Sequence, residues 1–272
     1  MNDDGDPKIY LLPNLMTAGN LFCGFAAVLK ILEGALVQST DVDRAAYFFH
    51  FAIWCILASC IFDALDGRVA RMGGHESPFG REFDSIADIV SFGVAPALLV
   101  YRIVLEKFPN AGWFIASIYL VCGALRLARF NCLAAANSTA ANTEFKGFPI
   151  PAAAGVIASI TLCLLWFDQN GREIGNGKWV LPPLMVFLSM MMFSGFRYPS
   201  FKAISIRTKR SLPKFIVIVA LVLFTVIYYQ WMPAVIFISY LLYGFLRPFL
   251  SRKMKEEIED ELEEDEDTAE SP

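Results

Sequence analysis

The feature that most constrains this 272-residue chain is a series of long segments that lack Asp, Glu, Lys and Arg. A helix that crosses a bilayer needs about 20 mostly apolar residues, and several of these segments reach that length. The charge-free segments are 9–29, 45–62, 108–125, 147–167, 179–196 and 215–246. The last is long enough for two helices, with Pro233 marking the turn, and a further apolar stretch at 79–104 is acidic in its first half. We therefore predict an all-α, polytopic transmembrane helical bundle of about eight spans.

Composition agrees with this fold class and divides the chain in two. Only 18% of the residues are charged, whereas about a quarter are charged in a typical soluble domain. The acidic residues gather near the end, where 11 of the 27 lie between positions 256 and 270. We therefore predict a transmembrane domain over 1–250 and an acidic, disordered tail over 251–272. Without that cluster the chain has 23 basic and 16 acidic residues, so its membrane-embedded body is basic.

The distribution of Lys and Arg predicts the orientation, because these residues accumulate in cytoplasmic loops. With eight spans and a cytoplasmic N-terminus, 17 of the 23 basic residues fall on the cytoplasmic side. Both termini are therefore predicted to be cytoplasmic. We expect a multi-pass protein of the cell (inner) membrane.

Four aspartates stand at the ends of two neighbouring predicted spans. Asp63 and Asp66 are three residues apart, and Asp84 and Asp88 are four apart, so each pair shares one helical face. The short, turn-rich connection at 72–78 makes the two helices antiparallel neighbours, so the acidic faces can converge. Acidic residues are costly inside a membrane, and they mark candidate functional sites there.

The chemistry of four clustered carboxylates favours a divalent cation, because like charges repel strongly where the dielectric is low. All-oxygen ligands suit Mg²⁺, Mn²⁺ or Ca²⁺. Arg71 follows at the same mouth and is suited to phosphate, and Gly67 and Gly80 allow close approach of a ligand to the backbone. The residues alone leave open a second hypothesis, a salt-bridged pathway for protons or ions between helices.

The spacing of these residues is more specific than their types. The pattern Asp63-x2-Asp66-Gly67-x2-Ala70-Arg71-x8-Gly80-x3-Asp84-x3-Asp88 resembles the signature of the CDP-alcohol phosphatidyltransferase family at all eight fixed positions. Further blocks resemble the phosphatidylserine synthase branch of that family. These blocks are 12–21, 82–97, 124–131 and 145–154.

The resemblance implies a reaction and a role for each signature residue. Members of this branch transfer a phosphatidyl group from CDP-diacylglycerol to the hydroxyl of L-serine and release CMP. The metal, Mg²⁺ or Mn²⁺ with Ca²⁺ able to bind in its place, is expected on Asp63, Asp66, Asp84 and Asp88, with Asp88 also the general base. The CDP pocket is expected to be lined by Asp66, Gly67, Ala70, Arg71 and Gly80. The resemblance further implies membrane lipids as partners, no nucleic acid, a homodimer and an active site on the cytoplasmic side.

Other positions have two interpretations each. Three residues lie at the end of the predicted fourth span: Arg126, Arg129 and Asn131. In one interpretation they contact serine or a phosphate. In the other, the two arginines only reach lipid headgroups. Thr17 and Asn20 hydrogen-bond the nucleotide or a neighbouring helix. Three competing functions remain open. The first is the same transfer to another alcohol, which is glycerol phosphate, inositol phosphate or choline. The second is an ion or proton transporter, and the third is an inactive scaffold.

Overall fold

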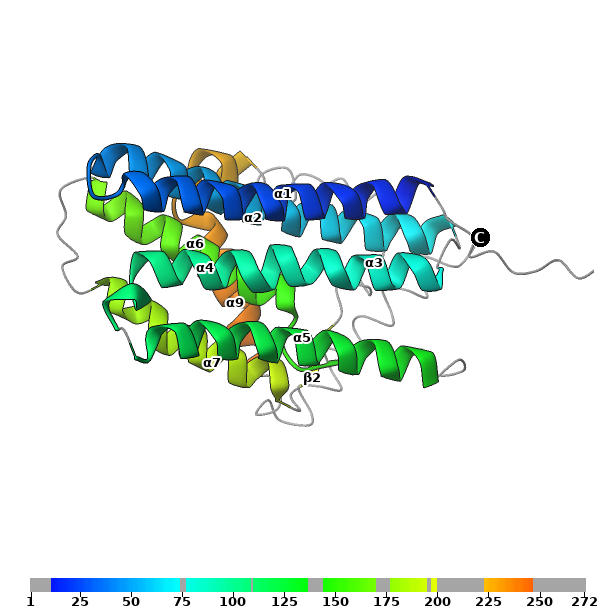
Figure 1. The fold of residues 1–272 in the computed structure, drawn as a ribbon. Helices are drawn as coiled ribbons and strands as arrows, with labels where there is room; N and C mark the ends of the chain where they lie inside the picture. The colour runs from blue at the N-terminus through cyan, green and yellow to red at the C-terminus, as the bar shows by residue number, and fades with distance from the viewer. Residues whose placement is uncertain are drawn as a thin grey trace, which may run out of the picture.

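The computed structural model describes residues 11–73, 77–108, 110–136, 144–169, 177–194, 197–199 and 223–246. Long helices dominate these residues, and they lie side by side in one bundle (Figure 1). The longer helices are α1 (Leu11–Val37), α2 (Val42–Gly73), α5 (Gly112–Ala136) and α6 (Ile150–Gln169). The shorter helices are α3 (Pro78–Asp88), α4 (Ala95–Ile103), α7 (Leu181–Phe193) and α9 (Met232–Leu246). Three further turns of helix are η1 (Ile89–Val94), η2 (Leu105–Lys107) and η3 (Gly177–Val180).

The predicted all-α class is confirmed for the described residues, apart from two strands of three residues. These strands, β1 (Glu144–Lys146) and β2 (Arg197–Pro199), pair antiparallel with Phe145 opposite Tyr198. Five helical segments are long and apolar enough to cross a membrane: Leu11–Val37, Val42–Val69, Pro78–Ile103, Gly112–Cys132 and Ile150–Gln169. The chain is therefore a multi-pass helical protein.

The count of eight spans stays a prediction. The segment 179–196 falls on a shorter apolar helix, Gly177–Phe193, and 215–246 is described only from residue 223. A turn at 228–231 precedes α9, so the chain reverses just before Pro233 rather than at it. Both termini, the acidic tail and residues 74–76 of the loop at 72–78 lie outside the described residues, and the side on which the termini lie stays a prediction.

A regular stripe on α1 forms the seam with its neighbours. Its buried residues recur at alternating steps of three and four, which is the spacing of one helical face. They are Pro13, Thr17, Asn20, Gly24, Ala27, Ile31 and Gly34. Most are small or polar, and such residues let membrane helices approach closely. At Gly24 a Cβ would lie 2.6 Å from the Ser91 Cα, so α1 and η1 meet backbone to backbone.

The third span is one continuous helical stretch made of α3, η1 and α4. The middle part, η1, is a π-helical segment that begins directly after Asp88. Pro96 follows it and has no N–H to donate to the carbonyl four residues earlier, that of Phe92. The buried Tyr119 hydroxyl of α5 donates to this Phe92 oxygen at 3.1 Å. The wide turn next to Asp88 is thus supported from a second helix.

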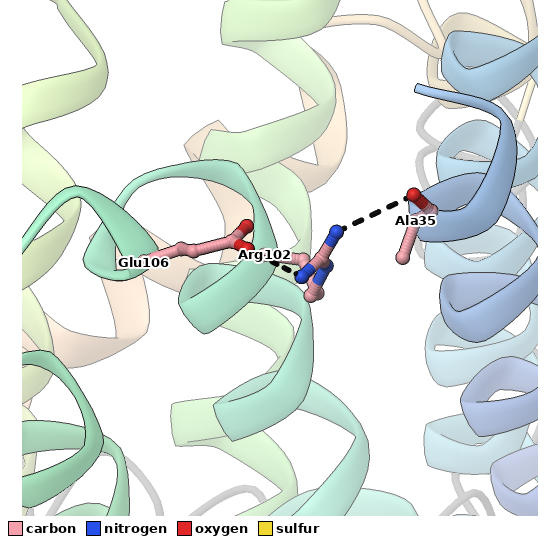
Figure 2. Close-up of polar contacts among 3 residues, drawn as sticks. All are labelled: Ala35, Arg102 and Glu106. Carbon is pink, nitrogen blue, oxygen red and sulfur yellow. Dashed lines mark hydrogen bonds and ion pairs between the residues drawn. The ribbon is translucent and has the colours of Figure 1, made fainter. Parts of the chain in front are cut away.

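At the end of the bundle distant from the aspartates, Arg102 joins α4 to α1 (Figure 2). Its Nη1 bonds Glu106 Oε1 at 2.8 Å and its Nη2 donates to the carbonyl oxygen of Ala35 at 3.4 Å. Ala35 lies in the last turn of α1, where carbonyls lack partners within the helix. The contact therefore ties the end of α1 to α4. The core beside it is apolar, and α6 is the most buried of the five spans.

Candidate active site

The four aspartates lie where the sequence predicts them, on α2 and α3. Ser77 caps α3, because its Oγ accepts a hydrogen bond from the Gly80 N–H at 3.0 Å, and Pro78 follows at the first helical position. A Cβ on Gly80 would lie 3.2 Å from Ser77 Oγ and 3.3 Å from Asn14 Oδ1. Gly80 thus permits tight packing at the start of α3, and its expected part in a CDP pocket stays a prediction.

Three of the four carboxylates converge. One oxygen each from Asp63, Asp66 and Asp84 lies within 4.8 Å of the others. Asp66 is buried, and Asp84 Oδ1 is a buried acceptor without a hydrogen-bond partner in the described part of the chain. Oxygen ligands of this number and type fit a hard divalent cation, which would also relieve their mutual repulsion. The three residues are therefore suited to holding a metal ion.

Asp88 lies one helical turn beyond Asp84 and is not among the three converging residues. Its side chain is buried, and its Oδ1 accepts a hydrogen bond from Asn20 Nδ2 at 3.1 Å. Its charge nevertheless interacts with those of Asp63, Asp66 and Asp84. The geometry thus separates a triad from a fourth carboxylate next to it, and metal binding by Asp88 stays a prediction.

The remaining signature positions lie on α2 close to the acids. Gly67 follows Asp66 directly and is partly exposed. Ala70 and Arg71 belong to the last turns of α2, but their side chains lie outside the described part of the structure. The expected contacts of these two residues with the nucleotide therefore stay predictions.

The three residues predicted on α5 have different surroundings. Arg126 interacts electrostatically with Asp88 and Asp63, and its Nε is a buried donor without a partner in the described residues. Arg129 is exposed. Asn131 Nδ2 donates to Ser85 Oγ on α3 at 2.9 Å, a contact that joins two helices. The structure thus brings Arg126 to the acids, leaves Arg129 at the surface and gives Asn131 a partner in a neighbouring helix.

Tyr240 on α9 is a residue that the sequence analysis missed. It interacts electrostatically with Arg126, and its ring packs on Phe148 with centroids 5.8 Å apart. The helix α9 contains none of the sequence motifs, so no spacing pointed to this residue. The only available signal was a tyrosine hydroxyl in an apolar segment, since such a group finds a polar partner when it is buried.

Comparison with known proteins agrees with this geometry. The family model for CDP-alcohol phosphatidyltransferase matches residues 10–194, which include α1 to α7 and all four aspartates. The chain belongs to the CDP-alcohol phosphatidyltransferase family. The match ends before α9, so Tyr240 lies outside the region that the family model covers.

Individual relatives from bacteria, archaea and yeast have related names. A CDP-diacylglycerol–serine O-phosphatidyltransferase of Helicobacter pylori is 36% identical over 88% of this chain and 91% of its own length. An archaetidylserine synthase of Methanothermobacter thermautotrophicus is 32% identical over 73% of this chain and 74% of its own. A Saccharomyces cerevisiae protein with the same name as the Helicobacter pylori relative is 35% identical over 65% of this chain and 64% of its own.

Proposed function

We propose that this protein transfers the phosphatidyl group of CDP-diacylglycerol to the hydroxyl of L-serine, which yields phosphatidylserine and CMP. The observation that carries this proposal is the convergence of Asp63, Asp66 and Asp84, with Asp88 one turn away, in a member of this transferase family. The names of the relatives support serine as the acceptor.

The reaction needs a base, because a serine hydroxyl is a weak nucleophile. In the proposed step the hydroxyl oxygen attacks the phosphorus that bears the diacylglycerol, and the bond from that phosphorus to the CMP oxygen breaks. The Asp88 carboxylate takes the hydroxyl proton. A metal ion held by Asp63, Asp66 and Asp84 would neutralise the pyrophosphate and stabilise the leaving CMP oxygen. Arg126, with its electrostatic contacts to Asp88 and Asp63, is suited to attract the serine carboxylate or a phosphate.

The position of the acids suits a substrate that is half lipid and half nucleotide. Asp63 and Asp66 lie in the last turns of the second span, and Asp84 lies in the first turns of the third. A site near the ends of spans lets the acyl chains stay in the bilayer while the nucleotide enters from the aqueous side. We place that side in the cytoplasm and the protein in the inner membrane. Clustering at one end disfavours a transporter, whose relay would be distributed across the membrane.

The decisive experiment is an acceptor screen with purified protein in detergent. CDP-diacylglycerol is supplied with L-serine, glycerol phosphate, inositol phosphate or choline, and CMP release is measured against added Mg²⁺ and Mn²⁺. We expect CMP release with serine that depends on the added metal. Release only with another alcohol would refute the proposed acceptor, and release that is insensitive to chelation would refute the metal dependence.

A further inference from the structure

Two polar residues of α1, Thr17 and Asn20, each contact one of the site's carboxylates. They lie three positions apart on the buried stripe, with exposed fractions of 3% and 0%. Neither belongs to the eight-position signature. We propose that Thr17 and Asn20 are positioning residues, which hold the carboxylates of Asp66 and Asp88 in the orientation that the reaction needs. This inference rests on the proposed function and extends it to a helix outside the aspartate pairs.

The placement of Asn20 is fixed from two other helices. Its backbone carbonyl accepts hydrogen bonds from Ser59 Oγ of α2 at 3.2 Å and from Ser91 Oγ of η1 at 3.0 Å. Its Nδ2 then donates to Asp88 Oδ1 at 3.1 Å. Because both the backbone and the amide are anchored, Asp88 has one oxygen occupied and a defined plane. In the proposed reaction its second oxygen takes the proton from the acceptor hydroxyl.

The other end of the same amide points to a role beyond packing. Asn20 Oδ1 is buried and has no hydrogen-bond partner among the described residues. A buried amide oxygen without a partner costs free energy, so an asparagine that only joined helices would be a poor solution at this position. The hydrogen bond that Asn20 Nδ2 donates to Asp88 explains why an amide stands at this position.

Thr17 contacts one of the three converging aspartates, Asp66. Its Oγ1 lies 3.0 Å from Asp66 Oδ2 and 3.2 Å from the carbonyl oxygen of Pro13, so its single proton is shared between two acceptors. Groups that hydrogen-bond a metal ligand orient it, and their removal typically weakens metal binding about 10- to 100-fold. Thr17 thus fixes the Asp66 carboxylate toward Asp63 and Asp84.

The test for Asn20 compares two variants in the same hydrogen-bonded group. Asn20→Leu removes the donor to Asp88. Ser59→Ala removes a hydroxyl that bonds the backbone carbonyls of Asn20 and Cys55, and it leaves the Ser91 bond to Asn20 in place. We expect Asn20→Leu to lower kcat about 10- to 100-fold, which corresponds to a hydrogen bond to a charged group. The KM values for CDP-diacylglycerol and serine should change less than about threefold. Ser59→Ala should lower kcat less than Asn20→Leu does, because Ser91 still holds the Asn20 carbonyl.

Thermal unfolding in detergent separates positioning from folding. If Asn20→Leu does not fold, Asn20→Ala replaces it, since this smaller side chain also lacks the donor. A kcat within threefold of wild type in a folded Asn20 variant would overturn the role of Asn20. Equal losses of kcat and of unfolding temperature in Asn20→Leu and Ser59→Ala would also overturn it, because they would indicate a structural role alone.

The test for Thr17 needs no turnover. Binding of Mn²⁺ alone is measured by electron paramagnetic resonance for wild type, Thr17→Val and Thr17→Ser. We expect about tenfold weaker binding in Thr17→Val, and recovery in Thr17→Ser, which restores the hydroxyl. Equal Mn²⁺ affinities in all three proteins would refute the positioning role of Thr17.

Failure of the proposed function gives a different result from failure of the positioning role. If wild type releases CMP only with another alcohol, serine is the wrong acceptor, and the Asn20 comparison is made with that alcohol. The manganese comparison is independent of any acceptor.

Discussion

The close contact between α1 and η1 predicts a large effect of adding a single methyl group at Gly24. In Gly24→Ala the new Cβ would lie 2.6 Å from the Ser91 Cα and would overlap the Ser91 Oγ. Ordinary contact begins at 3.4 Å, so the two backbones must separate by about 0.8 Å. Neither contact involves the flexible end of a long side chain, so the displacement falls on the helices themselves.

That displacement reaches the site within one helical turn. Asn20 lies one turn before Gly24, and its carbonyl accepts the Ser91 hydroxyl at 3.0 Å across the same interface. A separation of about 0.8 Å would break this bond and shift the donor to Asp88. Misplacement of a reacting group by about 1 Å can lower a rate about 100-fold. Overpacking of this kind also destabilises a fold by about 1–3 kcal/mol.

The control is a second glycine on the same helix. In Gly19→Ala the nearest atoms are Cδ1 and Cε1 of the Phe62 ring at 3.0 Å, and a side chain can move by the few tenths of an ångström required. CMP release and thermal unfolding are measured for both variants. We expect a large loss of kcat in Gly24→Ala and at most a small one in Gly19→Ala. Equal activity in the two variants would refute the argument that the α1–η1 contact sets the geometry of the site.

Three further substitutions test separate parts of the proposal. Asp88→Asn should lower kcat about 100- to 10,000-fold, as expected for loss of a general base, while CDP-diacylglycerol still binds in a titration; near-normal turnover would exclude Asp88 as the base. Asp84→Asn should raise the unfolding temperature of the metal-free protein, because it relieves repulsion among the carboxylates, and added Mn²⁺ should no longer raise that temperature. The control Asp168→Asn, at the exposed pair with Lys178, should change neither the unfolding temperature nor its response to Mn²⁺. Tyr240→Phe, which removes the hydroxyl near Arg126, should lower kcat/KM for serine about 3- to 10-fold, and the exposed Tyr243→Phe should not; equal effects would argue against a specific role of Tyr240.

Local patterns explain why much of the site could be predicted. The faces shared by Asp63 with Asp66 and by Asp84 with Asp88 follow from helical periodicity, and the short connection makes the two helices neighbours. The predicted convergence is confirmed for three of the four carboxylates. Asp88 is not among these three, and its Oδ1 accepts a hydrogen bond from Asn20, 68 residues earlier in the chain. No local spacing encodes a partner at that distance.

The same distinction applies to the positions with two interpretations. Asn131 has a partner on α3, Ser85, and only the packing of α5 beside the third span brings the two side chains together. Arg126 and Arg129 are indistinguishable by spacing, yet packing buries the Nε of Arg126 beside the acids and leaves Arg129 exposed. Tyr240 reaches Arg126 from a helix that contains no motif.

The sequence by itself determined the helical membrane class, the shared faces of the aspartate pairs and the signature of the family. These properties depend on residues within about 30 positions of one another, where the helix repeat and the length of an apolar run fix the outcome. Only the tertiary structure decided which carboxylate oxygens converge, which helix hydrogen-bonds Asp66 and Asp88, and where the π-helical turn after Asp88 finds its support. The physical reason is that these contacts join separate helices, and their distances depend on how closely small residues such as Gly24 let the helices approach.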